Sequence, residues 1–155
     1  MMNRFLLLLA LLSAPAPALA QGQVDLTSHV ALERTVTDAS GKATVKLEEP
    51  AKVVPGDKLL FTIHYSNASG KPADHFVVTN PIPSAVAFAG GETEGAQVSV
   101  DGGKTFGALG ALKVRSADGS ARAALPADVT HIRWTFAKPV AAGASDTLRF
   151  HATVR

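Results

Sequence analysis

The stretch TLRFHATVR, residues 147–155, decides the fold class of this 155-residue chain. Apolar side chains occupy every second position from Leu148 to Val154, and polar or charged side chains occupy the positions between them. Successive side chains of a β-strand point to opposite faces. The period of two therefore predicts a strand with one face in a core and the other in water.

The same alternation recurs before this stretch, in Leu59–Ser66 and His131–Phe136. The inward positions predict a core of Phe61, Ile63, Tyr65, Ile132, Trp134, Phe136, Leu148 and Phe150. Shorter strands are expected at His29–Val36, Thr44–Glu48, Phe76–Thr79, Ala85–Phe88, Gln97–Val100 and Ala111–Arg115. Many short strands separated by Gly and Pro turns indicate an all-β, antiparallel sandwich of the immunoglobulin-like kind. Residues 21–155 are expected to form one domain, with Gln21–Thr27 as a loose leader and one helical turn in Ser120–Leu125.

The first 20 residues have the anatomy of an export signal. Arg4 precedes an apolar run too short to span a bilayer, and Ala18-Leu19-Ala20 matches a signal-peptidase site. We expect cleavage after Ala20 and a periplasmic or secreted protein, with no membrane span in the mature chain. The chain has no Cys, so the fold is expected to stand without disulfides. Basic and acidic residues number 15 and 13, and this near balance does not favour nucleic acid as a partner.

Several motifs occur in a suggestive order along the chain. Pro55-Gly56-Asp57 precedes the aromatic strand Phe61–Tyr65, and Val77–Pro83 follows it. Trp134 and the last strand come later. This order resembles the immunoglobulin-like repeat called domain of unknown function eleven, found in bacterial and archaeal surface proteins. The resemblance covers about residues 25–155 and implies a fold but no activity. The chain departs from the pattern in Asn80, where Asp is usual, in an insertion from Gly90 to Pro126, and in holding a single copy.

Residues 99–106, SVDGGKTF, match the Asp-box pattern Ser-x-Asp-x-Gly-x-Thr-aromatic. In such a turn the Asp carboxylate accepts backbone N–H groups, glycine takes a positive φ, and the aromatic ring packs beneath. We interpret the motif as a structural turn, with a carbohydrate-facing role as the alternative. Its residues are Ser99, Asp101, Gly103, Thr105 and Phe106.

Three histidines, His64, His131 and His151, fall on the outward faces of predicted strands. If their strands are neighbours, these side chains are candidates for a metal site, although no H-x-H or H-E-x-x-H spacing supports one. Ordinary surface histidines are the alternative. No cofactor is expected, because the chain has no P-loop and no G-x-G-x-x-G.

The acidic residues lie mostly in predicted turns, and no G-x-S-x-G is present. The sequence therefore favours a non-enzymatic module of the cell envelope that binds an envelope or surface protein or has a structural role. A ligand or metal binder using the histidines, or a small glycan-active hydrolase, are the alternatives. The segment Gly90–Pro126 is the expected contact region, either as a loop or as extra strands packed on the sandwich.

Overall fold

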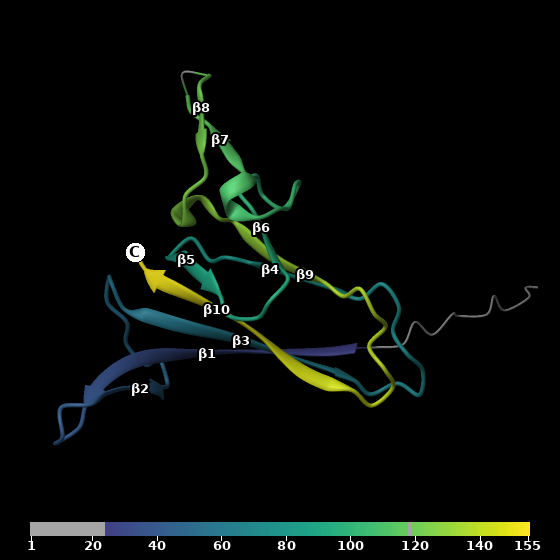
Figure 1. Ribbon diagram of the computed structural model, residues 1–155, viewed down its shortest axis with the longest axis horizontal. Helices are drawn as coiled ribbons and strands as arrows, with labels where there is room; N and C mark the ends of the chain where they lie inside the picture. The colour runs from purple at the N-terminus through teal and green to yellow at the C-terminus, as the bar shows by residue number, and fades with distance from the viewer. Residues whose placement is uncertain (1–23, 118) are drawn as a thin grey trace, which may run out of the picture.

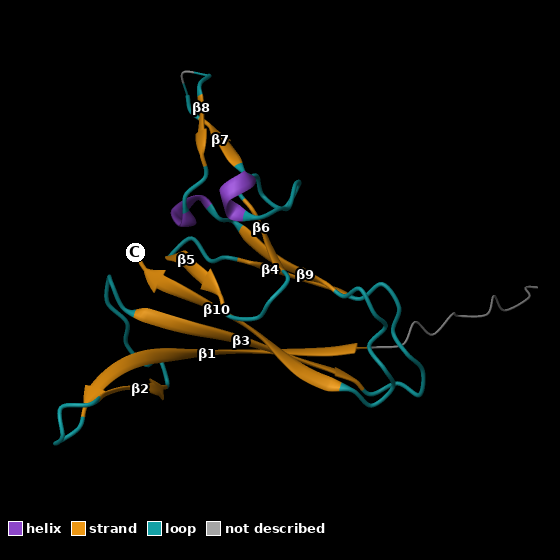
Figure 2. Cartoon of the chain, viewed as in Figure 1, coloured by secondary structure: helices purple, strands orange, loops and turns teal. Residues whose placement is uncertain are grey.

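A computed structural model describes residues 24–117 and 119–155 and confirms the all-β sandwich (Figure 1). Figure 2 shows strands joined by loops and turns, with two short 3-10 turns, η1 (Leu109–Ala111) and η2 (Pro126–Asp128). The predicted export signal, residues 1–20, lies outside the described residues, as does Asp118.

The larger of the two sandwich sheets has five strands in the order β2-β1-β3-β10-β5, all antiparallel to their neighbours. Its strands are β1 (Val24–Thr37), β2 (Ala43–Glu48), β3 (Lys58–Asn67), β5 (Val86–Gly91) and β10 (Ser145–Val154). The β1 strand is long because β3 pairs with its first part and β2 with its last part. The β1–β2 ribbon therefore extends beyond the rest of the sheet (Figure 1).

The smaller sheet has three antiparallel strands in the order β4-β9-β6. These strands are β4 (Val77–Pro81), β6 (Ala96–Ser99) and β9 (His131–Thr135). A separate two-stranded hairpin, β7 (Lys113–Arg115) with β8 (Ala121–Ala123), stands away from both sheets (Figure 1).

The core lies between the two sheets and centres on Phe150, whose side chain is 0% exposed. The Phe150 ring stacks on Phe61, with ring centroids 4.7 Å apart, and also contacts Phe88 and Trp134. Such aromatic pairs add to the free energy gained from burying their apolar area. The other predicted core side chains are also buried or pack against this cluster: Ile63, Tyr65, Ile132, Phe136 and Leu148.

Two local predictions were wrong. The helical turn expected in Ser120–Leu125 is instead β8, because Ala121–Ala123 pair with β7. The loose leader expected in Gln21–Thr27 contains the start of β1, since Val24–Thr27 pair with the end of β3. In both places pairing with a distant strand overrides the local preference of the chain. Of the segment Gly90–Pro126, β6 is an extra strand within the smaller sheet, whereas β7 and β8 pair only with each other and are not packed on the sandwich as strands of either sheet.

Candidate interaction site

We call residues 112–125 the hairpin arm. Its ladder pairs Lys113 with Ala123 and Arg115 with Ala121. The Ala124 N–H donates to the Leu112 carbonyl at 3.0 Å, which closes the arm at its base. Most of the arm's described side chains are exposed, so the arm adds little to the core. This arm is the described part of the insertion that protrudes furthest from the sandwich (Figure 1).

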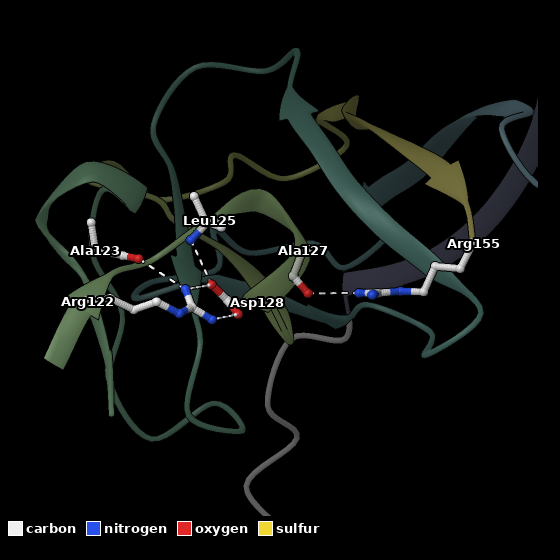
Figure 3. A network of polar contacts seen from close by, with 6 residues as sticks. All are labelled: Arg122, Ala123, Leu125, Ala127, Asp128 and Arg155. Atoms are coloured by element: carbon white, nitrogen blue, oxygen red, sulfur yellow. Dashed lines mark hydrogen bonds and ion pairs between the residues drawn. The ribbon is translucent and has the colours of Figure 1, made fainter. Parts of the chain in front are cut away.

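A two-pronged ion pair fixes the base of the arm. Arg122 donates from both terminal nitrogens to the Asp128 carboxylate, at 2.6 and 2.7 Å (Figure 3). The Leu125 N–H donates to the same carboxylate at 2.8 Å. The hydrogen bonds from Arg122, followed by the one from Leu125, lower the pKa of the Asp128 carboxyl to about 2. Asp128 is therefore ionised at neutral pH and holds the arm against η2.

The C-terminal residue ties this brace to the sandwich. Arg155 donates to the Val86 carbonyl at 2.9 Å. It also donates to the Ala127 carbonyl at 2.8 Å (Figure 3). Val86 begins β5 and Ala127 lies within η2. The base of the arm is thereby joined to the larger sheet. Nothing in the sequence indicated this contact, since its partners lie far apart along the chain.

The arm carries positive charge on one face. Lys113 and Arg115 are two residues apart on β7, so their side chains share a face, and their cross-strand neighbours are alanines. Both residues are exposed, and neither makes an ion pair within the described residues. This face is therefore free to meet an acidic surface.

The Asp-box residues form a closed turn after β6. The Asp101 carboxylate accepts the N–H groups of Lys104 and Thr105 and the hydroxyls of Ser99 and Thr105, at 2.7–3.1 Å. The Thr105 N–H, with these hydroxyls, lowers the pKa of the Asp101 carboxyl well below its ordinary value. Gly103 has a φ of 86° and donates to the Ser99 hydroxyl. Both carboxylate oxygens of Asp101 are engaged by the turn itself, which fits a structural role.

The aromatic residue of that turn has a partner that the sequence did not reveal. The guanidinium of Arg133, on β9, lies 3.6 Å from the centre of the Phe106 ring. Arg133 also donates to the Thr79 hydroxyl on β4 at 3.0 Å. The turn is thus attached to the smaller sheet by a cation–π contact.

The three candidate histidines do not converge. His131 lies on β9 of the smaller sheet, where its ring contacts the Thr130 hydroxyl at 3.1 Å. His64 and His151 lie on the outer face of the larger sheet, and His151 contacts the Glu33 carboxylate at 3.2 Å. Within the described part of the chain, no group of three His, Asp or Glu side chains is placed to hold a metal ion.

A small cleft at one end of the sandwich contains two carboxylates, Glu94 and Asp146, beside Tyr65 and Trp134. Burial raises the pKa of the Tyr65 hydroxyl. The cleft measures about 170 Å³, whereas small-molecule sites usually occupy roughly 300–1,000 Å³. Both carboxylates are exposed to water. The cleft offers little room for a sugar ring held between two carboxyl groups.

Comparison with family models, curated proteins and solved structures finds no match to this chain. No helix among the described residues is long and apolar enough to cross a membrane.

Proposed function

We propose that the chain is an exported, non-enzymatic module of the cell envelope that binds a protein partner through the hairpin arm. The observation that carries the proposal is the basic face of Lys113 and Arg115, presented on a hairpin whose base is fixed by Arg122 and Asp128. The partner surface is accordingly expected to be acidic, because complementary charge steers association and favours the correct partner.

The brace supports this proposal on energetic grounds. A protrusion that is ordered only on binding loses conformational entropy at that moment, and this loss weakens the complex. Arg122, Asp128 and Arg155 order the base of the arm in advance. The export signal anatomy of residues 1–20 and the resemblance to surface-protein repeats agree with a role in the envelope.

The test reverses the charge of the basic face. The variant Lys113→Glu/Arg115→Glu is compared with wild type and with Lys42→Glu/Lys52→Glu, which makes the same change of charge at exposed residues away from the arm. Each protein is immobilised and used to capture partners from an envelope extract. We expect wild type and the control to capture the same partner, and the arm variant to bind it at least about tenfold more weakly.

A second variant replaces residues 113–123 of the arm with a short turn. The Leu112 carbonyl and the Ala124 N–H are hydrogen-bonded, so a short Gly-Ser turn can join these two residues without disturbing the sandwich. Thermal unfolding shows whether each variant is folded. Equal recovery of partners by wild type, the charge variant and the armless variant contradicts the proposal.

A further inference from the structure

Among the residues that the structure describes, the larger sheet has a long unpaired edge along the first half of β1. The β3 strand pairs with one side of β1 from Val24 to Glu33, whereas β2 covers the other side only from Leu32 onward. We call Val24–Val30 the open edge. Its residues are exposed or half-buried, and Leu26 is 50% exposed. Figure 1 shows β2 beside only one end of β1.

The open edge lacks the features that protect the other strand edges from pairing with a second chain. The β4 strand ends in Pro81, the exposed β2 strand carries Lys46, and β5 ends in Gly90 and Gly91 beside a register irregularity. Proline, lysine and bulges are the usual means by which proteins blunt sheet edges. The open edge contains no Pro, Lys or Gly and pairs with β3 without a break in register.

Two backbone hydrogen bonds determine which residues of β1 direct their N–H and C=O groups toward β3 and which direct them away from it. The Asn67 N–H donates to the Ala144 carbonyl, so Asn67 faces β10 and the alternate residues of β3 face β1. By the same alternation Asp25, Thr27 and His29 bond to β3. The Asp38 N–H donates to the Lys42 carbonyl, which independently puts the even-numbered residues of β1 on the β2 side. Along the open edge, the N–H and C=O groups of residues 24, 26, 28 and 30 therefore point away from the sheet.

We infer that the open edge pairs antiparallel with the open edge of a second copy of this chain, about a two-fold axis at Thr27. Val24 then lies opposite Val30 of the partner subunit, and Leu26 opposite Ser28 of the partner subunit. Residues 24, 26, 28 and 30 of each copy, whose backbone groups point away from their own sheet, then lie opposite the same set of residues in the other copy. This arrangement allows about eight backbone hydrogen bonds between the two copies. The two larger sheets become one continuous sheet. The two copies are related by a two-fold axis, the commonest closed symmetry among homo-oligomers.

The side chains are complementary in the same register. On the outer face of the sheet, the Asp25 carboxylate lies opposite the partner's His29, and Thr27 faces its own copy. One ring nitrogen of His29 contacts Glu49 at 3.1 Å, which leaves the other for Asp25 of the partner subunit. On the opposite face, Val24, Leu26 and Val30 of both copies form a mainly apolar strip, in which each Ser28 lies opposite a Leu26.

Other registers satisfy fewer of these conditions. A shift of one residue places outward-facing backbone groups opposite inward-facing ones and abolishes the bonding. A shift of two residues retains backbone hydrogen bonding, but it separates Asp25 from His29 of the other copy. It also removes one of the four hydrogen-bonded residue pairs, at the end of the open edge. Because the β2 strand begins to cover β1 at Leu32, the described part of the free edge, from Val24 to Val30, is centred near Thr27.

The first test traps the dimer with a cysteine. Thr27 bonds to β3, so its pairing across the axis is of the non-hydrogen-bonded type, with Cα atoms about 4.5 Å apart and within reach of a disulfide. The natural chain has no Cys, so Thr27→Cys carries a single thiol. Mild oxidation of the folded, tag-free variant is expected to give a covalent dimer rapidly. Val45→Cys, an equally accessible thiol on the edge strand β2, is the matched control and is expected to crosslink far more slowly.

The second test weakens the pairing without a cysteine. Ser28→Pro removes an N–H that has no partner among the described residues of the single copy, and proline is tolerated where a strand N–H faces solvent. Sedimentation equilibrium over a wide concentration range is expected to show a wild-type dimer, an unchanged Ser28→Ala control, and a dissociation constant at least about tenfold higher for Ser28→Pro. Thermal unfolding of dilute protein verifies that Ser28→Pro is folded.

Two outcomes overturn the inference: wild type that is monomeric at every concentration, or Thr27→Cys that crosslinks no faster than Val45→Cys. The cysteine comparison stands even if Ser28→Pro fails to fold. Neither test involves the hairpin arm, so its outcome is independent of the proposed function.

Discussion

Asn67 shows, at the scale of a single residue, how the end of β3 is fastened to a distant loop. Its side chain is 0% exposed. The amide nitrogen donates to the carbonyls of Lys71, Val140 and Ala141 at 2.9–3.1 Å. The amide oxygen accepts from the backbone and hydroxyl of Ser69. Two segments that are 73 residues apart thus share one side chain.

Replacing Asn67 by alanine is expected to destabilise the fold by roughly 3 kcal/mol, because the fully buried side chain makes hydrogen bonds that alanine cannot replace. Urea-induced unfolding measures the difference. Asn80→Ala is the matched control, since Asn80 is only half-buried and its amide makes a single contact, to the Pro81 carbonyl. A loss in Asn67→Ala no larger than that in Asn80→Ala contradicts this account.

Asp101 predicts a particular dependence of stability on pH. Its pKa in the folded protein is lower than the ordinary value of 3.8, so the ionised carboxylate favours the folded state. That contribution is fully present above about pH 5 and is lost as the pH falls through about 4 toward the folded-state pKa. Asp128, whose folded-state pKa is about 2, acts in the same direction.

The comparison of wild type with Asp101→Asn isolates the Asp101 contribution. We expect the variant to be less stable at neutral pH and the gap to narrow in acid, because the wild-type carboxyl is then protonated as well. Chemical unfolding at a series of pH values checks this. A gap that is constant with pH contradicts the role given to the ionised carboxylate.

The sequence predicted contacts between residues that are close along the chain, but not contacts between residues that are far apart along it. The Asp-box pattern indicated the contacts of Asp101 because its partners lie within four residues along the chain. The contact of Phe106 with Arg133 and the bonds from Asn67 to Val140 gave no such signal. Their partners are brought together only by the pairing of the sheets.

At the scale of elements, the Arg122–Asp128 brace makes a prediction about the hairpin arm. Arg122→Lys retains the charge but loses the planar two-pronged geometry. Because the pair is partly exposed, we expect the free energy of unfolding to fall only slightly. The amide hydrogens of β7 and β8 are nevertheless expected to exchange with solvent faster. Hydrogen exchange read by mass spectrometry measures this, with the peptide over β9 as the internal control.

Unchanged exchange in the arm of Arg122→Lys contradicts the view that the brace orders the arm. Faster exchange in β9 as well points instead to a general loss of stability.

The strands differ in how far the sequence indicates them. The alternation in β3, β9 and β10 predicted these strands to within one or two residues, because each presents a buried face to the core. The β8 strand has three alanine-rich, exposed residues, and alanine favours helix in isolation. Only its pairing with β7 makes it a strand. Short elements without a buried face carry no periodic signal.

At the scale of the whole molecule, the core at Phe150 holds the two sheets together without disulfides. Phe150→Ala leaves a cavity beside Phe61 and Trp134, and we expect a loss of roughly 4 kcal/mol in the free energy of unfolding. Val45→Ala, at an exposed apolar residue, is the control and is expected to change stability by less than about 0.5 kcal/mol. Thermal and urea unfolding measure both. If the free energy of unfolding falls by a similarly small amount in both variants, the view that the core centres on Phe150 is wrong.

The sandwich as a whole could be predicted because inward positions alternate along every long strand. The order of strands could not, because alternation says which face is buried and not which strand is the neighbour. The open edge of β1 and the projecting hairpin arm both follow from that order. The open edge and the hairpin arm therefore could not be predicted from the alternation of apolar and polar residues.

The buried amide of Asn67 has a consequence for how the protein can be produced. Asn67-Ala68-Ser69 is an acceptor sequence for N-linked glycosylation. A eukaryotic secretory host attaches its oligosaccharide to the amide nitrogen, which here points into a closed site and donates to three carbonyls. A sugar at that atom cannot fit inside the closed sandwich, so the glycosylated polypeptide is expected to be retained as misfolded material. Ser69→Ala removes the acceptor sequence for such hosts, while leaving the Asn67 amide nitrogen and its three carbonyl partners in place.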